Sequence, residues 1–217
     1  MAGPGPQAQV VPLHARTLAR LHPLTAKSVF WEVDPLNASF QDTVSEMDKG
    51  AWLAARAEEQ DTVGFSIAEA ASTRGALATV LYCPAKHAPG AVRMPTAPVS
   101  VGAWLVTSLH IDTVARNRGW ESVLLDSAIM AATGAGAEAL EVFGVRPDGT
   151  ASSDSAASLR RSAAQIGLVE VSLLESAGFM VVRDHDVIPR LRLELPPAHE
   201  LLSAREVESL LAGVPLA

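Results

Sequence analysis

The sequence predicts an α+β fold in which helices flank a mixed β-sheet of about seven strands, with a further helix at the C-terminal end. Short apolar segments recur along the chain, separated by turn residues, which is typical of strands. After residue 100 the segments alternate strand, helix, strand, helix, strand, whereas the earlier part indicates two helices and a run of antiparallel strands. At 217 residues and 48% hydrophobic content, the chain has enough apolar side chain to bury one core.

The N-terminal half supplies the first group of predicted elements. We expect a strand in "VVPL", helices in "HARTLARLHPL" and "NASFQDTVSEMD", and strands in "AWLAARA", "TVGFSIAEA" and "GALATVLYCP". The polar "EEQD" between the first two of these strands indicates a hairpin, and Gly50 is expected to stop the second helix. The segment "KHAPGAVRMPTAPVS" is rich in Pro and Gly and predicts an irregular loop.

The C-terminal half predicts the strand–helix alternation. Strands are expected in "GAWLVTSLHID", "ALEVFGV" and, twice, in "MVVRDHDVIPRLRLEL"; helices are expected in "WESVLLDSAIMAATGAGA", "LVEVSLLESAGF" and "HELLSAREVESLLAG". The Ser/Ala-rich "RPDGTASSDSAASLRRSAAQ" has no hydrophobic period and predicts a surface loop. The domain boundaries that follow are a flexible N-terminus at 1–9, one domain at 10–195 with a long polar loop at 146–165, and a C-terminal helical extension at 196–217.

The long segment "GAWLVTSLHID" predicts a strand in the middle of the sheet, because it is mostly apolar. A regular strand alternates its side chains between the two faces. One face is then expected to carry Leu105, Thr107, Leu109 and Ile111, and the other Val106, Ser108 and His110.

The charge and the cysteine and histidine content of the sequence disfavour several classes of function. A net charge of −7 disfavours nucleic-acid and anionic-membrane binding, which need a basic face. The single cysteine, Cys83, rules out an intrachain disulfide and fits a reducing compartment, so we expect a cytoplasmic protein. We expect no metal site, because the six histidines are scattered, and neither a secretory signal nor a membrane span, because no long apolar run occurs.

The stretch "VARNRGWESVLLDSAI" concentrates positive charge where a strand turns into a helix. Arg116, Arg118 and Gly119 precede the helical pattern, and a helix N-terminus offers unpaired N–H groups that favour an anion. An arginine-bearing turn without a ligand is the alternative. No GxxxxGK[ST] occurs, and "GAGAEA" follows a helix instead of a strand, so the phosphate motifs of nucleotide sites are excluded.

These residues resemble a known family, the GCN5-related N-acetyltransferases (GNAT). Its motif [QR]-x-x-G-x-[GA] is matched by Arg116 and Gly119 of "RNRGWE", although Glu121 stands at the last position. The segment "SLLESAGF" is similar to the family's penultimate helix with its Gly-Phe ending, and "FWEV", "PTAPVS", "LEVFG" and "PRLRLEL" resemble a bacterial branch. The order of elements from Val10 to about Leu195 also agrees, so the resemblance covers most of the chain.

The resemblance implies that acetyl-CoA binds between two splayed parallel strands and donates its acetyl group to an amine. Main-chain groups of Leu109, His110 and Ile111 would pair with the pantetheine arm, and a main-chain N–H of this strand would polarise the thioester carbonyl. The pyrophosphate would bind at the corner formed by Arg116, Asn117, Arg118, Gly119, Trp120, Glu121 and Ser122.

The family's usual acid and base are missing from this sequence. The two positions expected for a base are Leu105 and Thr107, and the position of a tyrosine acid is Leu174. Glu32, beside Trp31 in the connection that usually lines the acceptor cleft, is the candidate base, with a surface ion pair or a helix cap as its alternative role. His110 is a second candidate, although the sequence favours a buried, hydrogen-bonded histidine over a catalytic one at this position.

Two functions therefore remain open at this level. The first is an acetyl-CoA-dependent N-acetyltransferase that acts on a small-molecule or peptide amine, and the second is a degenerate CoA-binding or regulatory protein of the same fold. Glu121 would weaken CoA binding if it faced the pyrophosphate, or would stabilise the helix N-terminus if it pointed outward. An exposed apolar stripe on the C-terminal helix would suit a homodimer.

Overall fold

The chain, as a computed structural model, is described at residues 8–33, 45–70, 72–73, 75–151 and 153–212. Within these ranges seven strands follow one another across a sheet in the order β1-β2-β3-β4-β5-β8-β7, and a short strand, β6, pairs with β5 beside this path. The strands are β1 (Ala8–Leu13), β2 (Gly64–Glu69), β3 (Ala78–Pro84), β4 (Ala103–Ile111), β5 (Ala139–Val145), β6 (Val169–Glu170), β7 (Met180–Arg183) and β8 (Arg190–Glu194). The predicted mixed sheet is confirmed.

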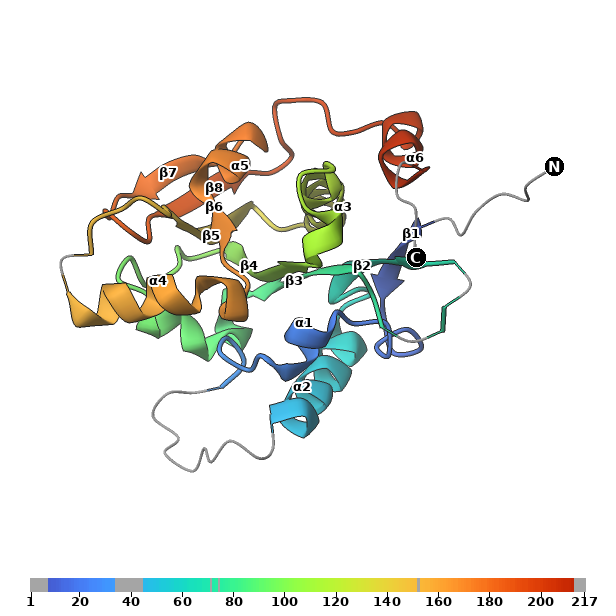
Figure 1. Cartoon of the computed structure of the whole chain (residues 1–217), viewed down its shortest axis with the longest axis horizontal. Helices are drawn as coiled ribbons and strands as arrows, with labels where there is room; N and C mark the ends of the chain where they lie inside the picture. Colours follow the sequence, from blue (N-terminus) through green and yellow to red (C-terminus); the bar gives the residue numbers. More distant parts are fainter. Residues whose placement is uncertain (1–7, 34–44, 71, 74, 152, 213–217) are drawn as a thin grey trace.

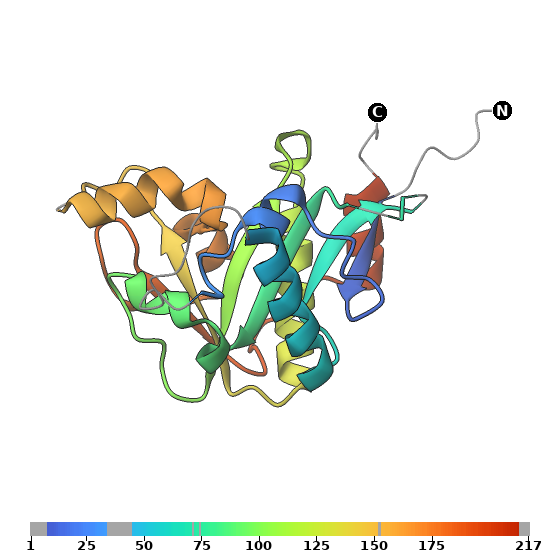
Figure 2. The ribbon, with the colours of Figure 1, turned by 90° about the horizontal axis from the view of Figure 1, so that it is seen from below.

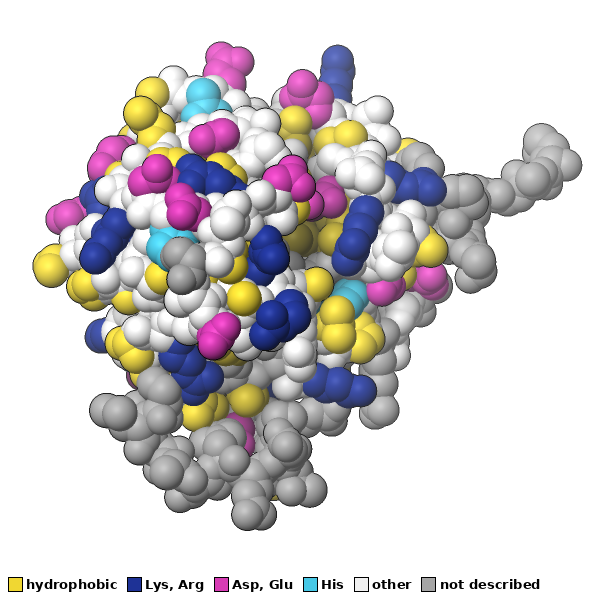
Figure 3. Space-filling view, turned by 60° about the vertical axis from the view of Figure 1, so that its left-hand side comes forward, with side chains coloured by type: hydrophobic (Ala, Val, Ile, Leu, Met, Phe, Trp, Pro, Cys, Tyr) yellow, Lys and Arg dark blue, Asp and Glu magenta, His cyan; other side chains and the backbone are white. Residues whose placement is uncertain are grey.

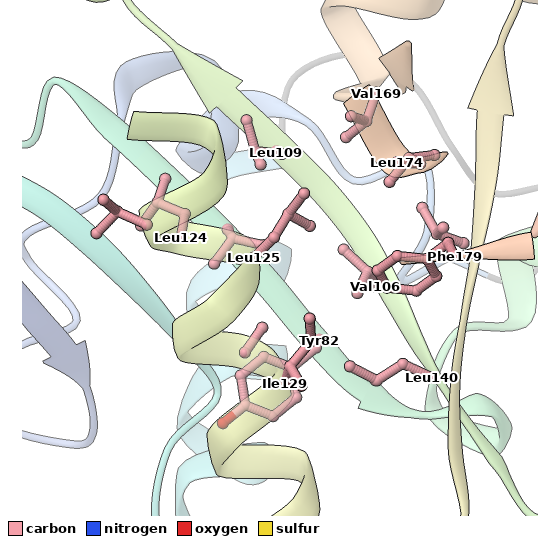
Figure 4. Packing of buried hydrophobic residues seen from close by; sticks show 14 of the residues in the cluster. Tyr82, Val106, Leu109, Leu124, Leu125, Ile129, Leu140, Val169, Leu174 and Phe179 are labelled. Carbon is pink, nitrogen blue, oxygen red and sulfur yellow. The ribbon is translucent and has the colours of Figure 1, made fainter. Parts of the chain in front are cut away.

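Helices cover both faces of the sheet (Figures 1 and 2). One face carries α3 (Trp120–Gly134), α5 (Val171–Ser176) and α6 (Ala204–Ala212). The other face carries α1 (Pro23–Lys27), α2 (Ser45–Glu59) and α4 (Asp154–Ile166). The main core lies between α3 and the sheet, where Leu124, Leu125 and Ile129 meet Val106 and Leu109 of β4 (Figure 4).

Strand β4 is central, as predicted, but its alternation is interrupted by a β-bulge. Its pairing with β3 moves from Leu81–Ser108 to Tyr82–Val106, which leaves Thr107 as an extra residue. Side chains on the two sides of the bulge therefore exchange faces. Leu109 packs under α3, whereas Leu105 belongs to the cluster with Trp31 on the opposite face. The prediction that Leu105 and Leu109 share a face is wrong for this reason.

Strands β4 and β5 run parallel and then separate. Their pairing extends from Ala103–Ala139 to Val106–Val142. Beyond that point β5 pairs with β6 instead, through Gly144–Val169 and Val145–Glu170. Since β6 connects α4 on one face with α5 on the other, the chain crosses the sheet through the gap between the two strands (Figure 1).

The N-terminal half differs from the sequence prediction at helix α2. Residues 51–57 are helical and not a strand, so no hairpin connects them to β2, and Gly50 lies inside the helix instead of ending it. Gly50 is exposed, with no neighbouring atom within 4 Å of the position that a Cβ would occupy, and the Ala-rich sequence around it favours a helix enough to tolerate it. The expected helix at 14–24 is a series of turns followed by the five-residue α1. Residues 37–44 lie outside the described residues, and 45–48 belong to α2.

The predicted polar loop at 146–165 is also wrong, because residues 154–166 form helix α4. The Ser153 hydroxyl accepts a hydrogen bond from the N–H of Ala156 at the N-cap, and Gly167 ends the helix in the left-handed conformation at φ 75°. Only Ala156 and Ile166 of this helix are buried, which explains why its sequence lacks a hydrophobic period.

The first strand and the last helix of the structure differ slightly from the predicted domain boundaries. Strand β1 begins at Ala8, so residues 8 and 9 are part of the sheet, and residues 1–7 lie outside the description. Helix α6 occupies the middle of the predicted extension at 196–217. Among the described residues, none of the helices combines the length and the apolar character that crossing a membrane requires.

Candidate functional site

The corner between β4 and α3 has the geometry of an anion site. A 3-10 turn at Thr113–Ala115 follows β4, and Asn117 and Gly119 both adopt positive φ angles, 58° and 79°, which turn the chain into α3. Helix α3 begins at Trp120 without a side-chain cap. Its first N–H groups and its dipole therefore favour a negatively charged ligand beside Arg116.

Helix α6 supports this corner from behind. The indole of Trp120 is fully buried and donates a hydrogen bond of 3.1 Å from Nε1 to the carbonyl oxygen of Leu210. The Leu210 side chain also lies against Gly119, and the Asp126 carboxylate accepts a hydrogen bond from the N–H of Leu202. The apolar face of α6 is thus packed within the chain, which removes the exposed stripe on which the expected homodimer depends; the homodimer itself stays a prediction.

A cleft of about 860 Å³ opens in front of the corner. Its volume is within the range of sites that hold a small molecule or a cofactor. The corner and the end of β4 form one wall, and α4, β6 and α5 form the other. In Figure 3, Lys and Arg side chains flank a hollow near the middle of the molecule. The lining includes these predicted cofactor residues: Leu109, His110, Ile111, Arg116, Asn117, Glu121 and Ser122.

Three predicted residues are outside the lining of the cleft, namely Arg118, Gly119 and Trp120. Gly119 and Trp120 pack against α6 instead. The Trp120 indole therefore points toward α6, whereas the main chain of Asn117 stays beside the cleft. The predicted roles of all these residues in cofactor binding stay predictions.

Two arginines on the opposite wall are functional candidates that the sequence analysis does not identify. Arg160 and Arg161 of α4 line the cleft, and Arg160 donates a hydrogen bond from Nη1 to the carbonyl oxygen of Gly149. The capping signals, Ser153 at one end and Gly167 at the other, could have predicted the helix that presents them.

His110 lines the cleft but is held in a neutral form. Its Nε2 donates to the carbonyl oxygen of Gln165 at 3.1 Å, so Nδ1 accepts from the hydroxyl of Thr25 at 2.9 Å. The ring also stacks on His22, with 5.8 Å between the ring centroids. Burial lowers the pKa of His110 to about 4. Because both nitrogens are engaged, this placement argues against His110 as a general base.

Glu32 lies outside the cleft lining, in a buried ion pair. Its Oε1 is 2.6 Å from Nζ of Lys49, and both side chains are almost completely buried, at 2% and 1% exposure. Among the described residues, its Oε2 has no hydrogen-bond partner. A carboxylate paired with a lysine and kept away from the cleft is a poor candidate for deprotonating a substrate, so the base role assigned to it stays an unsupported prediction.

The positions at which the resemblance implies an acid and a base carry structural side chains. Leu105 and Leu174 are fully buried, and the Thr107 hydroxyl donates to the carbonyl oxygen of Leu81. Among the residues that the structure describes, the carboxylates that line the cleft are Glu121, at the corner, and Glu170, on β6. The described residues contain no group of three or more His, Cys, Asp or Glu side chains arranged to hold a metal ion.

This chain resembles known proteins in its structure. Neither a protein-family model nor a curated protein matches the sequence. A candidate acetyltransferase from Acinetobacter baylyi ADP1 superposes with a TM-score of 0.50 at 12% identity, covering 92% of this chain and 98% of that one. The chain has the GNAT fold.

Two further solved structures are similar to this chain at equally low identity. An N-acetyltransferase from Staphylococcus aureus Mu50 has a TM-score of 0.49 at 14% identity, covering 87% of this chain and 98% of its own. A GNAT-family acetyltransferase from Brucella melitensis, solved in complex with acetyl-CoA, has a TM-score of 0.45 at 12% identity, covering 91% and 96%.

Proposed function

We propose that this chain is an acetyl-CoA-dependent N-acetyltransferase. The observation that carries the proposal is the position of the uncapped N-terminus of α3, with Arg116 beside it, at the mouth of the gap between β4 and β5. A diphosphate at this corner would accept hydrogen bonds from main-chain N–H groups and from the guanidinium. The cleft continues from there along the end of β4, where an extended pantetheine arm would lie.

The reaction is direct transfer within a ternary complex. The lone pair of the acceptor amine attacks the thioester carbonyl carbon and the C–S bond breaks. The amine gives one proton to a carboxylate of the cleft, which returns it to the departing thiolate, so the products are an N-acetyl compound and CoA. The cleft contributes by holding both reactants together and by directing a main-chain N–H at the carbonyl oxygen as negative charge develops there.

Within the proposal, Glu170 is the side chain that accepts the amine proton. Among the described residues, two carboxylates line the cleft. Glu121 lies at the anion corner, where it would sit beside the bound diphosphate and not beside the acceptor amine, whereas Glu170 lies across the gap on β6. Glu170 is exposed to solvent and is the last residue of the segment that closes the gap. We expect Glu170→Gln to lower kcat/KM by about 100-fold or more at neutral pH.

The test is an activity assay with a panel of amines and acetylatable peptides. The purified protein is incubated with acetyl-CoA, and both the thiol released and the acetylated acceptor are measured by absorbance and mass spectrometry. Transfer by the wild type that Glu170→Gln abolishes and Glu32→Gln retains supports the proposal. Binding of acetyl-CoA without transfer to any acceptor would instead identify a CoA-binding protein of the same fold.

A further inference from the structure

Residues 165–170 close the gap between β4 and β5, and the carbonyl groups of the first three of them all accept hydrogen bonds. The carbonyl oxygen of Gln165 accepts from His110 Nε2, that of Ile166 from Trp31 Nε1 at 2.8 Å, and that of Gly167 from the N–H of Leu109 at 2.9 Å. These are carbonyls at the end of α4, which a helix cannot satisfy internally. Three donors of the core therefore hold the C-terminus of α4 in place.

The following residues are held from the other side of the gap. Val169 and Glu170 pair with Gly144 and Val145 of β5, and the side chain of Val169 is buried in the core under α3. The side chain of Ile166 is buried in the second core cluster, with Trp31. The segment 165–170, which we call the plug, is thus bonded to both strands that border the gap and anchored in both cores.

The plug leaves no room for a larger residue at its closest approach to β4. A Cβ atom on Gly167 would lie 2.6 Å from Cβ of Ser108 and 3.0 Å from the N atom of Leu109, and the residue has a φ of 75°. Contact this close shows that the plug and the strand pack directly against each other, so a side chain at position 167 would displace one of them.

The hydrogen bond to Gly167 has a consequence for the proposed reaction. The N–H of Leu109 is the amide at the base of the gap, three residues beyond the last β4–β5 pair at Val106. It cannot donate to a thioester carbonyl while it donates to Gly167. The N–H of Asp112 donates to Leu77 beside β3, so the amides of Leu109 and Ile111 both face the other way, toward the gap.

We propose that the plug is a permanent part of the donor site and that the main-chain N–H of Ile111, not that of Leu109, polarises the thioester carbonyl. This inference rests on the proposed acetyltransferase function. Two residues along a strand correspond to about 7 Å, so the reacting carbonyl lies that much nearer the mouth of the cleft. Ile111 lines the cleft there, together with Leu24 of α1 and Ala163 and Ala164 of α4.

The test uses amide NMR spectra of the full chain saturated with acetyl-CoA and with CoA. The two ligands differ only in the acetyl group, so the amide with the largest shift difference identifies the donor to the carbonyl. We expect that amide to be Ile111, with the hydrogen exchange of Leu109 as slow with ligand as without it. A largest difference at Leu109, or a loss of its protection when acetyl-CoA binds, would overturn the inference.

A pair of glycine variants tests the permanence of the plug without a ligand. Gly167→Ala and Gly136→Ala impose the same backbone strain, since Gly136 has a φ of 79°, but Gly136 has no atom within 4 Å of the added methyl group. We expect Leu109 to lose its exchange protection in Gly167→Ala and to keep it in Gly136→Ala. In the wild type, a Leu109 amide that exchanges far faster than the amides of β3 would contradict a permanent plug, even if Gly167→Ala does not fold.

The outcomes separate this inference from the proposed function. If neither ligand shifts any amide of the Arg116 corner, the donor site itself is misplaced, and both proposals are refuted. If the corner responds to both ligands but the acetyl group acts on Leu109, the donor site is supported and the role of the plug is refuted.

Discussion

The N–H of Leu109 on β4 donates a hydrogen bond of 2.9 Å to the carbonyl oxygen of Gly167 at the end of α4. This bond joins the central strand to a segment that begins as a polar, Ser/Ala-rich sequence and ends buried between two parallel strands. Through it, α4 becomes one wall of the cleft and brings Arg160 and Arg161 to face the corner at Arg116. The shape of the cleft therefore depends on α4 as much as on the sheet.

The indole of Trp31 should contribute to the docking of α4. Replacing Trp31 with Phe keeps an aromatic ring but leaves the buried carbonyl of Ile166 without its donor, which costs about 1–3 kcal/mol. We expect a loss of this size in urea denaturation, with faster hydrogen exchange in α4. Trp52→Phe is the control, because its Nε1 donates to His87, away from α4. Equal exchange of α4 in the two variants would contradict the account.

His110 should make stability depend on pH below neutrality. Its pKa is lowered by burial to about 4 from 6.5, so the unfolded chain binds more protons than the folded one between these values. The contribution of His110 to the free energy of unfolding is fully present above pH 6.5. It is lost as the pH is lowered toward 4, which costs about 3 kcal/mol. Urea denaturation from pH 7 to 4 should show a shallower decline for His110→Gln; parallel curves would exclude this contribution.

The buried pair of Glu32 and Lys49 should matter for stability more than for catalysis. Glu32→Gln leaves the Lys49 ammonium buried without a counter-charge, which costs about 3–5 kcal/mol. Replacing both residues with Met removes both charges and should restore most of the loss. A Glu32→Gln variant that unfolds at the wild-type urea concentration, or that loses activity while fully folded, would show that the pair has another role.

Glu121 should oppose the anion that Arg116 attracts. It lines the cleft within the first turn of α3, so its carboxylate repels a diphosphate bound at the helix N-terminus. Removing one such charge near the protein surface is worth about 1 kcal/mol, and we expect Glu121→Gln to bind CoA about fivefold more tightly at low salt. Glu208→Gln, on the exposed side of α6, is the control. Weaker binding of Glu121→Gln would mean that Glu121 holds the ligand instead.

The sequence predicts the sheet and the corner well because both depend on local signals. Arg116 and Gly119 stand between a long apolar strand and a helix, and the structure has that corner. The sequence does not predict the helix through Gly50, because alternating Ala and apolar residues resemble a strand when only Leu53 of the segment is buried. The bulge at Thr107 depends on pairing with β3, and the hydrogen bond to Gly167 joins residues 58 positions apart, so neither has a local sequence signal.

Binding of acetyl-CoA at the Arg116 corner is the central claim, and calorimetric titration tests it most directly. The wild type should bind acetyl-CoA, and Arg116→Ala should raise the Kd about tenfold or more, as expected for losing a charged hydrogen bond of about 1.5–3 kcal/mol. Arg205→Ala, an exposed arginine on α6, should bind like the wild type. No binding by the wild type, or the same Kd for Arg116→Ala, would contradict the account.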